Sequence, residues 1–184
     1  MPNHILNELS ISAPLSTVAP LVLNDEGCID FEVLLPLPLN FWNGHVGAEH
    51  KKVFPGDGMS WSVANWGTKW NAYGLDAEAE HYQPVTENGG RTVLTFKTAW
   101  SPPMGWVVAL FNKLRLSMDL TSLDEGSDHA VNDRFAWNVG MGPWEDGPQW
   151  NRTQAPADET ERLRCLYWGT EEWAKIKAEM EEEE

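Results

Sequence analysis

Residues 61–73 place three tryptophans and one tyrosine within thirteen positions. Asn65 is a favourable N-cap residue, and a helix that begins there puts Trp66, Trp70 and Tyr73 on one side, at spacings i, i+4 and i+7. A glycine follows Tyr73, where such a helix would end. The spacing therefore predicts a short helix with one aromatic stripe.

The stripe also constrains the rest of the fold, because each large ring buries about 150–250 Å² when it packs. We expect Trp66, Trp70 and Tyr73 to form a structural anchor with Trp100, and Gly67 to let the chain approach the strand that ends at Trp100. This anchor would fix a mostly irregular insertion onto a sheet. The alternative is that the rings form an aromatic platform for a ligand.

Eleven of the 184 residues are tryptophan, which predicts an aromatic-rich core in one domain or in one domain with an appendage. Cys28 and Cys165 lie far apart without metal-ligand spacing, which is typical of reduced thiols in a cytosolic protein. Neither a signal peptide nor an apolar run long enough for a membrane span is present. We expect a cytosolic protein that contacts no membrane.

The charge is strongly negative and unevenly distributed. Thirteen Lys and Arg against 28 Asp and Glu give −15. Residues 1–118 carry eleven acids and seven bases, whereas residues 119–184 carry seventeen acids and six bases. Direct nucleic-acid binding needs the opposite charge. The acids could instead imitate nucleic acid on a basic surface of another protein, or they could simply confer solubility.

The first third of the chain predicts a strand, a helix and a strand, at residues 5–12, 16–23 and 31–35. Residues 39–60 are rich in Gly, Pro and polar side chains, which indicates a long loop. With the Trp-rich segment it makes an insertion at about residues 39–74. His45, Glu49 and His50 lie in this loop, but their spacing matches no zinc motif, so we expect solvated loop residues and no metal or cofactor.

The middle of the chain predicts a hairpin, an amphipathic helix and two strands. Asn88-Gly89 between two β-prone runs, at 77–83 and 91–100, is a hairpin signal. A helix capped by Ser101 should follow, with Val107, Leu110, Phe111 and Leu114 on its buried side. The two strands are expected at 118–123 and 134–139, joined by an acidic turn at 124–128 that lacks an EF-hand ligand pattern.

Residues 141–184 are expected to form an acidic extension with a different character. A loop rich in Gly, Pro and Trp spans 140–156, and two helices with acidic first turns are predicted at 158–168 and 170–180. Together with residues 1–140, this predicts an α+β protein of the split β-α-β (ferredoxin-like) type. It would have an antiparallel sheet, helices on one face, a long insertion and a C-terminal acidic helical extension.

The segments Asn-Trp-Gly-Thr-Lys-Trp-Asn-Ala-Tyr at 65–73 and Thr-Ala-Trp-Ser-Pro-Pro at 98–103 resemble a family of bacteriophage and plasmid proteins of unknown function. The opening Met-Pro-Asn and the Leu-Pro-Leu-Pro turn at 35–38 are similar as well. That family is described as carrying a ferredoxin-like domain, so the resemblance implies this fold over about residues 1–140. It also implies phage or mobile-element origin, and it implies no activity. The chain departs from the family at residues 123–129, where a glycine-rich hairpin is usual, and in its acidic extension.

No catalytic motif is present, so the favoured hypothesis is a non-catalytic accessory protein that binds and inhibits a bacterial nucleic-acid-binding defence protein, of anti-CRISPR or anti-restriction type. The sequence does not indicate the oligomeric state. The candidate contacts are the acids of the C-terminal part: Asp124, Glu125, Asp128, Asp133, Glu145, Asp146, Glu171 and Glu172.

Two alternatives remain open. One is an enzyme, or a protein that binds a small molecule or metal, with a site between the insertion and the sheet. It would use His45, Glu49, His50 or His81 with Trp66 as a platform, although no nucleophile and base pair follows from the spacing. The other is a phage housekeeping factor, which the sequence does not separate from an inhibitor.

Overall fold

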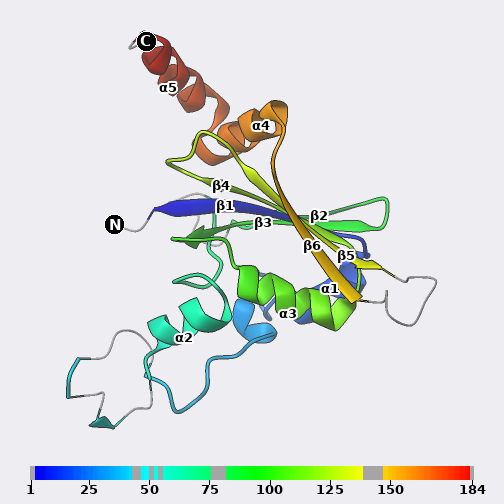
Figure 1. Cartoon of the computed structure of the whole chain (residues 1–184), viewed down its shortest axis with the longest axis vertical. Coiled ribbons are helices and arrows are strands. Elements are labelled where there is room, and N and C mark those ends of the chain that lie inside the picture. The colour runs from blue at the N-terminus through cyan, green and yellow to red at the C-terminus, as the bar shows by residue number, and fades with distance from the viewer. Residues whose placement is uncertain are drawn as a thin grey trace.

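The protein is an α+β structure built on one six-stranded antiparallel sheet (Figure 1). This computed structural model describes residues 3–42, 47–49, 52–53, 56–75, 82–138 and 147–182. The strands are β1 (His4–Ile11), β2 (Val85–Asn88), β3 (Arg91–Ala99), β4 (Met118–Asp124), β5 (Val131–Asn138) and β6 (Gly147–Gln154). Their order in the sheet is β2-β3-β1-β4-β5-β6.

Five α-helices occur in the described part of the chain. They are α1 (Leu15–Val22), α2 (Gly58–Asn65), α3 (Met104–Leu114), α4 (Ala157–Trp168) and α5 (Thr170–Glu182). The predicted first helix, the amphipathic helix and the two C-terminal helices are therefore present, with ends that differ by at most three residues. Helix α3 begins after Pro103 rather than at the expected Ser101 cap.

Strand β1 lies at the centre of the sheet, and its predicted alternation is confirmed. Leu9 pairs with Leu94 of β3 on one side and with Leu120 of β4 on the other, and all three side chains are fully buried. Asn7 lies on the same face, where its amide donates to Thr98 Oγ1 and accepts from Ser122 Oγ, each at 2.9 Å. Because both ends of this amide have partners, a polar group is tolerated in the core.

Helices α1 and α3 cover this face of the sheet and enclose an aromatic core. Phe31 lies between the rings of Trp66, Phe96 and Trp106, with ring centroids 4.6–5.7 Å apart. The expected apolar side of α3 is confirmed, since Val107, Leu110 and Phe111 are buried.

The core helices α1 and α3 share one face as predicted, whereas α4, which belongs to the C-terminal extension, lies on the opposite face (Figure 1). Leu163 of α4 is fully buried and packs with Leu6 of β1 and Leu123 of β4. Arg162 also ties α4 to the sheet, because its guanidinium donates to both carboxylate oxygens of Glu8.

Three local predictions are wrong. Residues 31–35 form no strand: Phe31–Val33 is a short 3₁₀ helix, η1, capped by Asp30, whose side chain accepts from Glu32 N. No helix runs from residue 65 to 73, because α2 ends where that helix was expected to begin. The expected loop at 140–156 contains the edge strand β6.

The predicted hairpin is present, but its first strand is β2 and lies later than the expected run at 77–83, most of which falls outside the described residues. Gly89 and Gly90 form its turn with φ of +59° and +74°. Two positive φ angles are what a two-residue turn between twisted strands requires.

Candidate functional site

The Trp-rich segment crosses the end of β3 in an irregular, closely packed path. Trp66 is only 4% exposed, and its Nε1 donates to Leu35 O at 2.9 Å. Gly67 has a φ of +87°, which turns the chain away from the axis of α2. Thr68 Oγ1 then donates to Ala99 O at 2.7 Å. These contacts explain why α2 stops before the stripe predicted from the sequence.

The four aromatics of the expected anchor therefore do not form one buried stripe. Trp66 is buried, whereas Trp70 and Trp100 are 43% and 46% exposed and Tyr73 is partly buried. The ammonium of Lys69 lies between the two exposed indoles, 4.9 Å from the Trp70 ring centroid and 4.4 Å from that of Trp100. Trp100 also has a φ of +76°, a strained conformation for a bulky residue.

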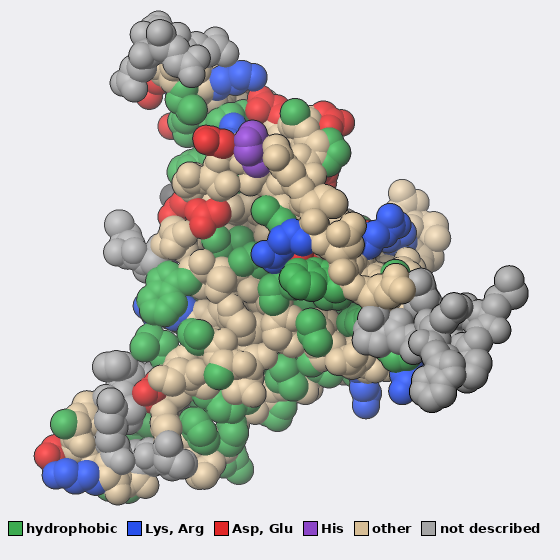
Figure 2. All heavy atoms as spheres, viewed as in Figure 1, with side chains coloured by type: hydrophobic (Ala, Val, Ile, Leu, Met, Phe, Trp, Pro, Cys, Tyr) green, Lys and Arg blue, Asp and Glu red, His purple; other side chains and the backbone are tan. Residues whose placement is uncertain are grey.

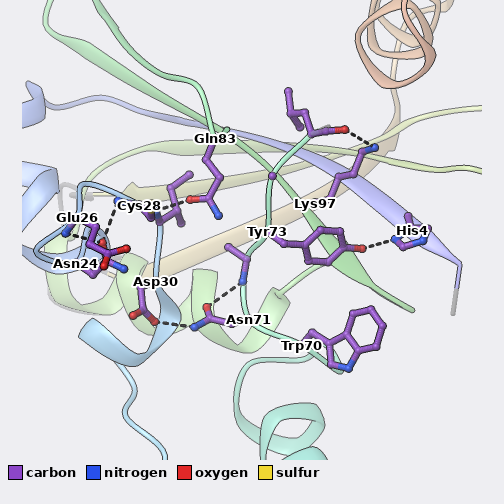
Figure 3. A pocket seen from close by; sticks show the side chains of 14 residues that line it. His4, Asn24, Glu26, Cys28, Asp30, Trp70, Asn71, Tyr73, Gln83 and Lys97 are labelled. Carbon is purple, nitrogen blue, oxygen red and sulfur yellow. Dashed lines mark hydrogen bonds between the residues drawn. The ribbon is translucent and has the colours of Figure 1, made fainter. Parts of the chain in front are cut away.

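A cavity of about 660 Å³ opens between this segment and the sheet (Figure 3). Residues 70–75 form one wall, and residues 24–30 contribute the facing side together with Gln83. The side chain of Asn71 joins the two walls, because it donates to Asp30 Oδ1 at 2.7 Å and accepts from Phe31 N at 2.8 Å. The Gln83 side chain accepts from Ile29 N, which fixes Gln83 to the loop at residues 24–30.

His4 and Tyr73 meet at the other end of the cavity. The Tyr73 hydroxyl donates its only hydrogen to Thr98 O at 2.8 Å, so the Nδ1 of His4, at 2.5 Å, must donate to the Tyr73 oxygen. This assigns the Nδ1-protonated tautomer to a neutral His4 and leaves Nε2 as an acceptor. Burial, with a smaller contribution from Glu125, raises the pKa of Tyr73 above its usual range and keeps the phenol neutral.

A second polar cluster connects this end of the cavity to α4. Lys97 Nζ donates to Leu75 O at 2.8 Å and lies 4.1 Å from the ring centroid of Tyr167. Glu125 accepts from the Tyr167 hydroxyl at 2.7 Å and from His4 N at 3.0 Å. Burial, followed by the hydrogen bond to Glu125, raises the pKa of Tyr167. The cluster joins β1, β3, the β4–β5 turn and α4.

The structure brings several of the predicted acidic contacts to one end of the molecule. Asp124, Glu125 and Asp128 border a groove of about 170 Å³ that is completed by residues of α4 and α5. Arg164 of α4 donates to Asp128 O at 2.8 Å, which fixes the acidic turn beside the helix. Glu171 and Glu172 are exposed in the first turn of α5. Figure 2 shows acidic side chains at this end, with basic ones among them.

Asp133 differs from the other predicted contacts, because its side chain is fully buried. Arg152 and Trp150 of β6 both donate to its carboxylate. A carboxylate surrounded in this way cannot face a partner, so Asp133 is removed from the contact set. Its strand position alone would suggest this, since Asp133 lies on the same side of β5 as Phe135.

Other predicted site residues cannot be placed. Glu145, Asp146, His45, His50 and His81 lie outside the described residues. Glu49 is exposed and pairs with Lys52 at 3.0 Å. Within the described ranges, no three His, Cys, Asp or Glu side chains come together as metal ligands. No described helix is long and apolar enough to cross a membrane.

No protein-family model, no curated protein and no solved structure matches the chain. The geometry of its own residues therefore has to carry any functional argument.

Sequence reasoning placed a possible site between the insertion and the sheet but assigned it to other residues. The cavity is lined by Asn71, Gln83, Asp30 and His4, which come from four separate segments. One signal points to this cavity, because Trp70 and Tyr73 belong to the aromatic stripe that could form a ligand platform. The amide and carboxylate side chains of the wall lie in separate segments without a shared sequence motif. The sequence alone therefore does not show that they lie together.

Proposed function

We propose that this protein is a non-catalytic accessory protein of phage or mobile-element origin that binds and inhibits a bacterial nucleic-acid-binding defence protein. The CRISPR effectors and restriction enzymes are the defence classes we consider. One observation supports this proposal: the acidic β4–β5 turn lies against α4 and α5, so acids from separate segments share one end of the molecule.

Of the four basic residues of α4 and α5, three pair with a glutamate, and the fourth, Arg164, lines the groove and donates to backbone carbonyls of the acidic turn. Arg162, Lys175 and Lys177 each form an ion pair with a glutamate of α4 or α5, at 2.7–3.2 Å. Asp128 and Glu171 are exposed, and neither forms an ion pair with a described Lys or Arg. These two carboxylates are therefore the best candidates for contacts with a basic partner.

Apolar side chains beside the acids would add contact area. Trp168 and Met180 border the groove between the acidic turn and the two helices, and both are about half exposed. Tryptophan frequently contributes a large share of the energy of protein interfaces. A surface with carboxylates around a partly exposed indole suits a nucleic-acid groove, where basic residues and apolar surface alternate.

We also propose that β1 to β4, with α1 and α3, form a split β-α-β (ferredoxin-like) unit. The connection through α1 leads from β1 to β2, and β3 lies between these two strands in the sheet. The connection through α3 leads from β3 to β4, and β1 lies between them. The strand order supports this assignment, and β5 and β6 then extend the unit on one side.

Affinity capture from a bacterial lysate tests the partner. The tagged protein should retain a nucleic-acid-binding defence protein at low salt and lose it as salt rises, because exposed charge pairs are screened. Asp128→Lys with Glu171→Lys should weaken retention strongly. Retention of a replication or assembly protein instead would indicate a housekeeping factor.

A matched control separates local charge from net charge. Asp25→Lys with Glu26→Lys changes the net charge by the same amount, but in an exposed turn that is far from the groove residues in the sequence. Retention should survive this change. Salt-independent retention, or equal losses with both double variants, would rule out the acidic end as the binding surface.

A further inference from the structure

We propose that the cavity between residues 24–30 and residues 70–75 binds a small organic amine that has an apolar body. This ligand site is separate from the acidic end formed by α4 and α5. The volume of about 660 Å³ is in the range of cavities that hold small ligands. Figure 3 shows the carboxylates of Glu26 and Asp30 at one end and the indole of Trp70 at the other.

The electrostatics of the cavity favour a cation. Residues 24–32 carry Asp25, Glu26, Asp30 and Glu32, and residues 1–50 contain no Lys or Arg. Burial, with a smaller contribution from the charge of Asp30, raises the pKa of Glu32, which follows residues 24–30 and does not line the cavity. An ammonium group that enters at this end therefore meets carboxylates without a basic residue of the same segment to compete.

The hydrogen-bonding groups support the same conclusion. Asp30 Oδ1 accepts from Glu32 N and from Asn71, and its Oδ2 has no hydrogen bond to any described residue. At the opposite end, the Nε2 of a neutral His4 is an acceptor, because the contact with Tyr73 takes the Nδ1 hydrogen. Among the described residues of the wall, Lys97 carries the ammonium, which already donates to Leu75 O and lies over Tyr167. The wall thus offers spare acceptors, which suits a donor-bearing ligand.

The aromatic end accounts for the apolar body. Trp70 is 43% exposed although it lines a cavity, and it packs edge-on against Tyr73 with ring centroids 6.1 Å apart. Ala72 and Leu75 add apolar surface between these rings and the rest of the wall. A flat or alkyl group that covers Trp70 removes apolar surface from water, and the same ligand can direct its ammonium to the carboxylates.

Three indoles of equal size test the charge requirement: tryptamine is a cation, tryptophol is neutral and indole-3-acetate is an anion. Isothermal titration calorimetry of the full chain at physiological salt should show saturable binding of tryptamine. Tryptophol should bind at least about fivefold more weakly, which is the effect of one charge pair near the surface. Indole-3-acetate should be weaker still. No saturable heat from tryptamine up to about 1 mM, or equal affinity for all three, would overturn the proposal.

Two pairs of variants test the location. Glu26→Gln should weaken tryptamine binding about fivefold, whereas Asp25→Asn should leave it unchanged, because only Glu26 lines the cavity. Trp70→Ala should weaken binding at least tenfold, whereas Trp100→Ala, which removes an equally exposed indole on the other side of Lys69, should not. Circular dichroism confirms that each variant is folded. Equal effects within either pair would show that the amine binds elsewhere, through net charge or non-specific hydrophobic contact.

Discussion

Arg152 donates two hydrogen bonds to Asp133 across the β5–β6 pair, from Nε to Oδ1 at 2.7 Å and from Nη2 to Oδ2 at 2.9 Å. Trp150 Nε1 donates a third, to Oδ1 at 2.9 Å. The carboxylate is fully buried, whereas Arg152 is 48% exposed. The edge strand β6 is therefore joined to the sheet through a buried charge that receives three donors from β6.

Arg152→Ala should lower the free energy of unfolding by about 2–4 kcal/mol, because one donor is left for a buried carboxylate. The value lies at the lower end for buried pairs, since Arg152 is partly exposed. Urea denaturation at neutral pH measures it. Arg134→Ala is the control, because Arg134 is 69% exposed and meets Asp119 at 3.4 Å; it should cost less than about 1 kcal/mol. Equal costs would contradict a special role for the Asp133 pair.

Gly105→Ala should destabilise the protein, although alanine normally stabilises a helix relative to glycine by about 1 kcal/mol. A Cβ at residue 105 would clash with Asn65 O, a backbone atom that cannot easily move. The end of α2 would have to separate from α3, which we expect to cost about 1–3 kcal/mol. Thermal denaturation gives the sign directly.

Gly126→Ala is the matched control for this change. Its added Cβ would have only a side-chain oxygen of Asp124 nearby, at 3.7 Å. It should therefore be nearly neutral. A stabilised Gly105→Ala protein would show that the contact between α2 and α3 is looser than the structure indicates.

Two buried tryptophans should respond differently to the same replacement. Trp66→Phe removes the donor to Leu35 O, whereas the Nε1 of Trp106 has no hydrogen-bond partner among the described residues although the side chain is fully buried. Trp66→Phe should thus cost about 1–2 kcal/mol more than Trp106→Phe, since only the former leaves a carbonyl without its donor. Trp66→Ala should cost about 3–5 kcal/mol. Chemical denaturation of the three variants measures these differences, and unchanged stability of Trp66→Ala would contradict its role as an anchor.

The elements that were predictable from sequence are those with a regular apolar period. Strand β1 alternates from Asn7 to Ile11, and α3 repeats its apolar side chains at helical spacing, so both were located correctly. Residues 31–35 contain the same types of apolar residue but form no strand. Asp30 caps a 3₁₀ turn there, and Asn71, forty residues later, takes the Phe31 N–H. Because Asn71 lies so far along the chain, the local sequence around residues 31–35 does not reveal this hydrogen bond.

The predictions for the Trp-rich segment and for β6 were wrong for the same physical reason. Tertiary contacts determine the backbone conformation of both. The spacing of Trp66, Trp70 and Tyr73 is helical, but Gly67 turns the chain toward Ala99. Strand β6 lacks β-branched residues except Thr153, and its pairing with β5 and Asp133 makes it a strand. The cavity was unpredictable in detail because its polar groups come from segments that meet only in the folded chain.

Tyr73 and Tyr167 should make the protein sensitive to alkaline pH. The pKa of each phenol is raised in the folded state, mainly by burial, above the value of about 10 in an unfolded chain. The folded state therefore keeps protons that the unfolded state releases. Stability from these groups is fully present below about pH 10 and is lost as the pH rises above it, by at most about 1.4 kcal/mol per pH unit for each tyrosine. Solvent exposure reduces this figure, because both side chains are only partly buried.

Tyr167→Phe provides the test of this linkage. The variant should be less stable at neutral pH, because the hydrogen bond to Glu125 is lost, but its stability should fall less steeply between about pH 9 and 11. Urea denaturation across this pH range gives both slopes, and the near-ultraviolet absorbance of phenolate shows when the tyrosines ionise. If the wild-type protein and Tyr167→Phe lost stability with equal slopes, Tyr167 would have to ionise as readily in the folded chain as in the unfolded one. The contact between Glu125 and α4 would then be open to water, contrary to the packing of Lys97 over the Tyr167 ring.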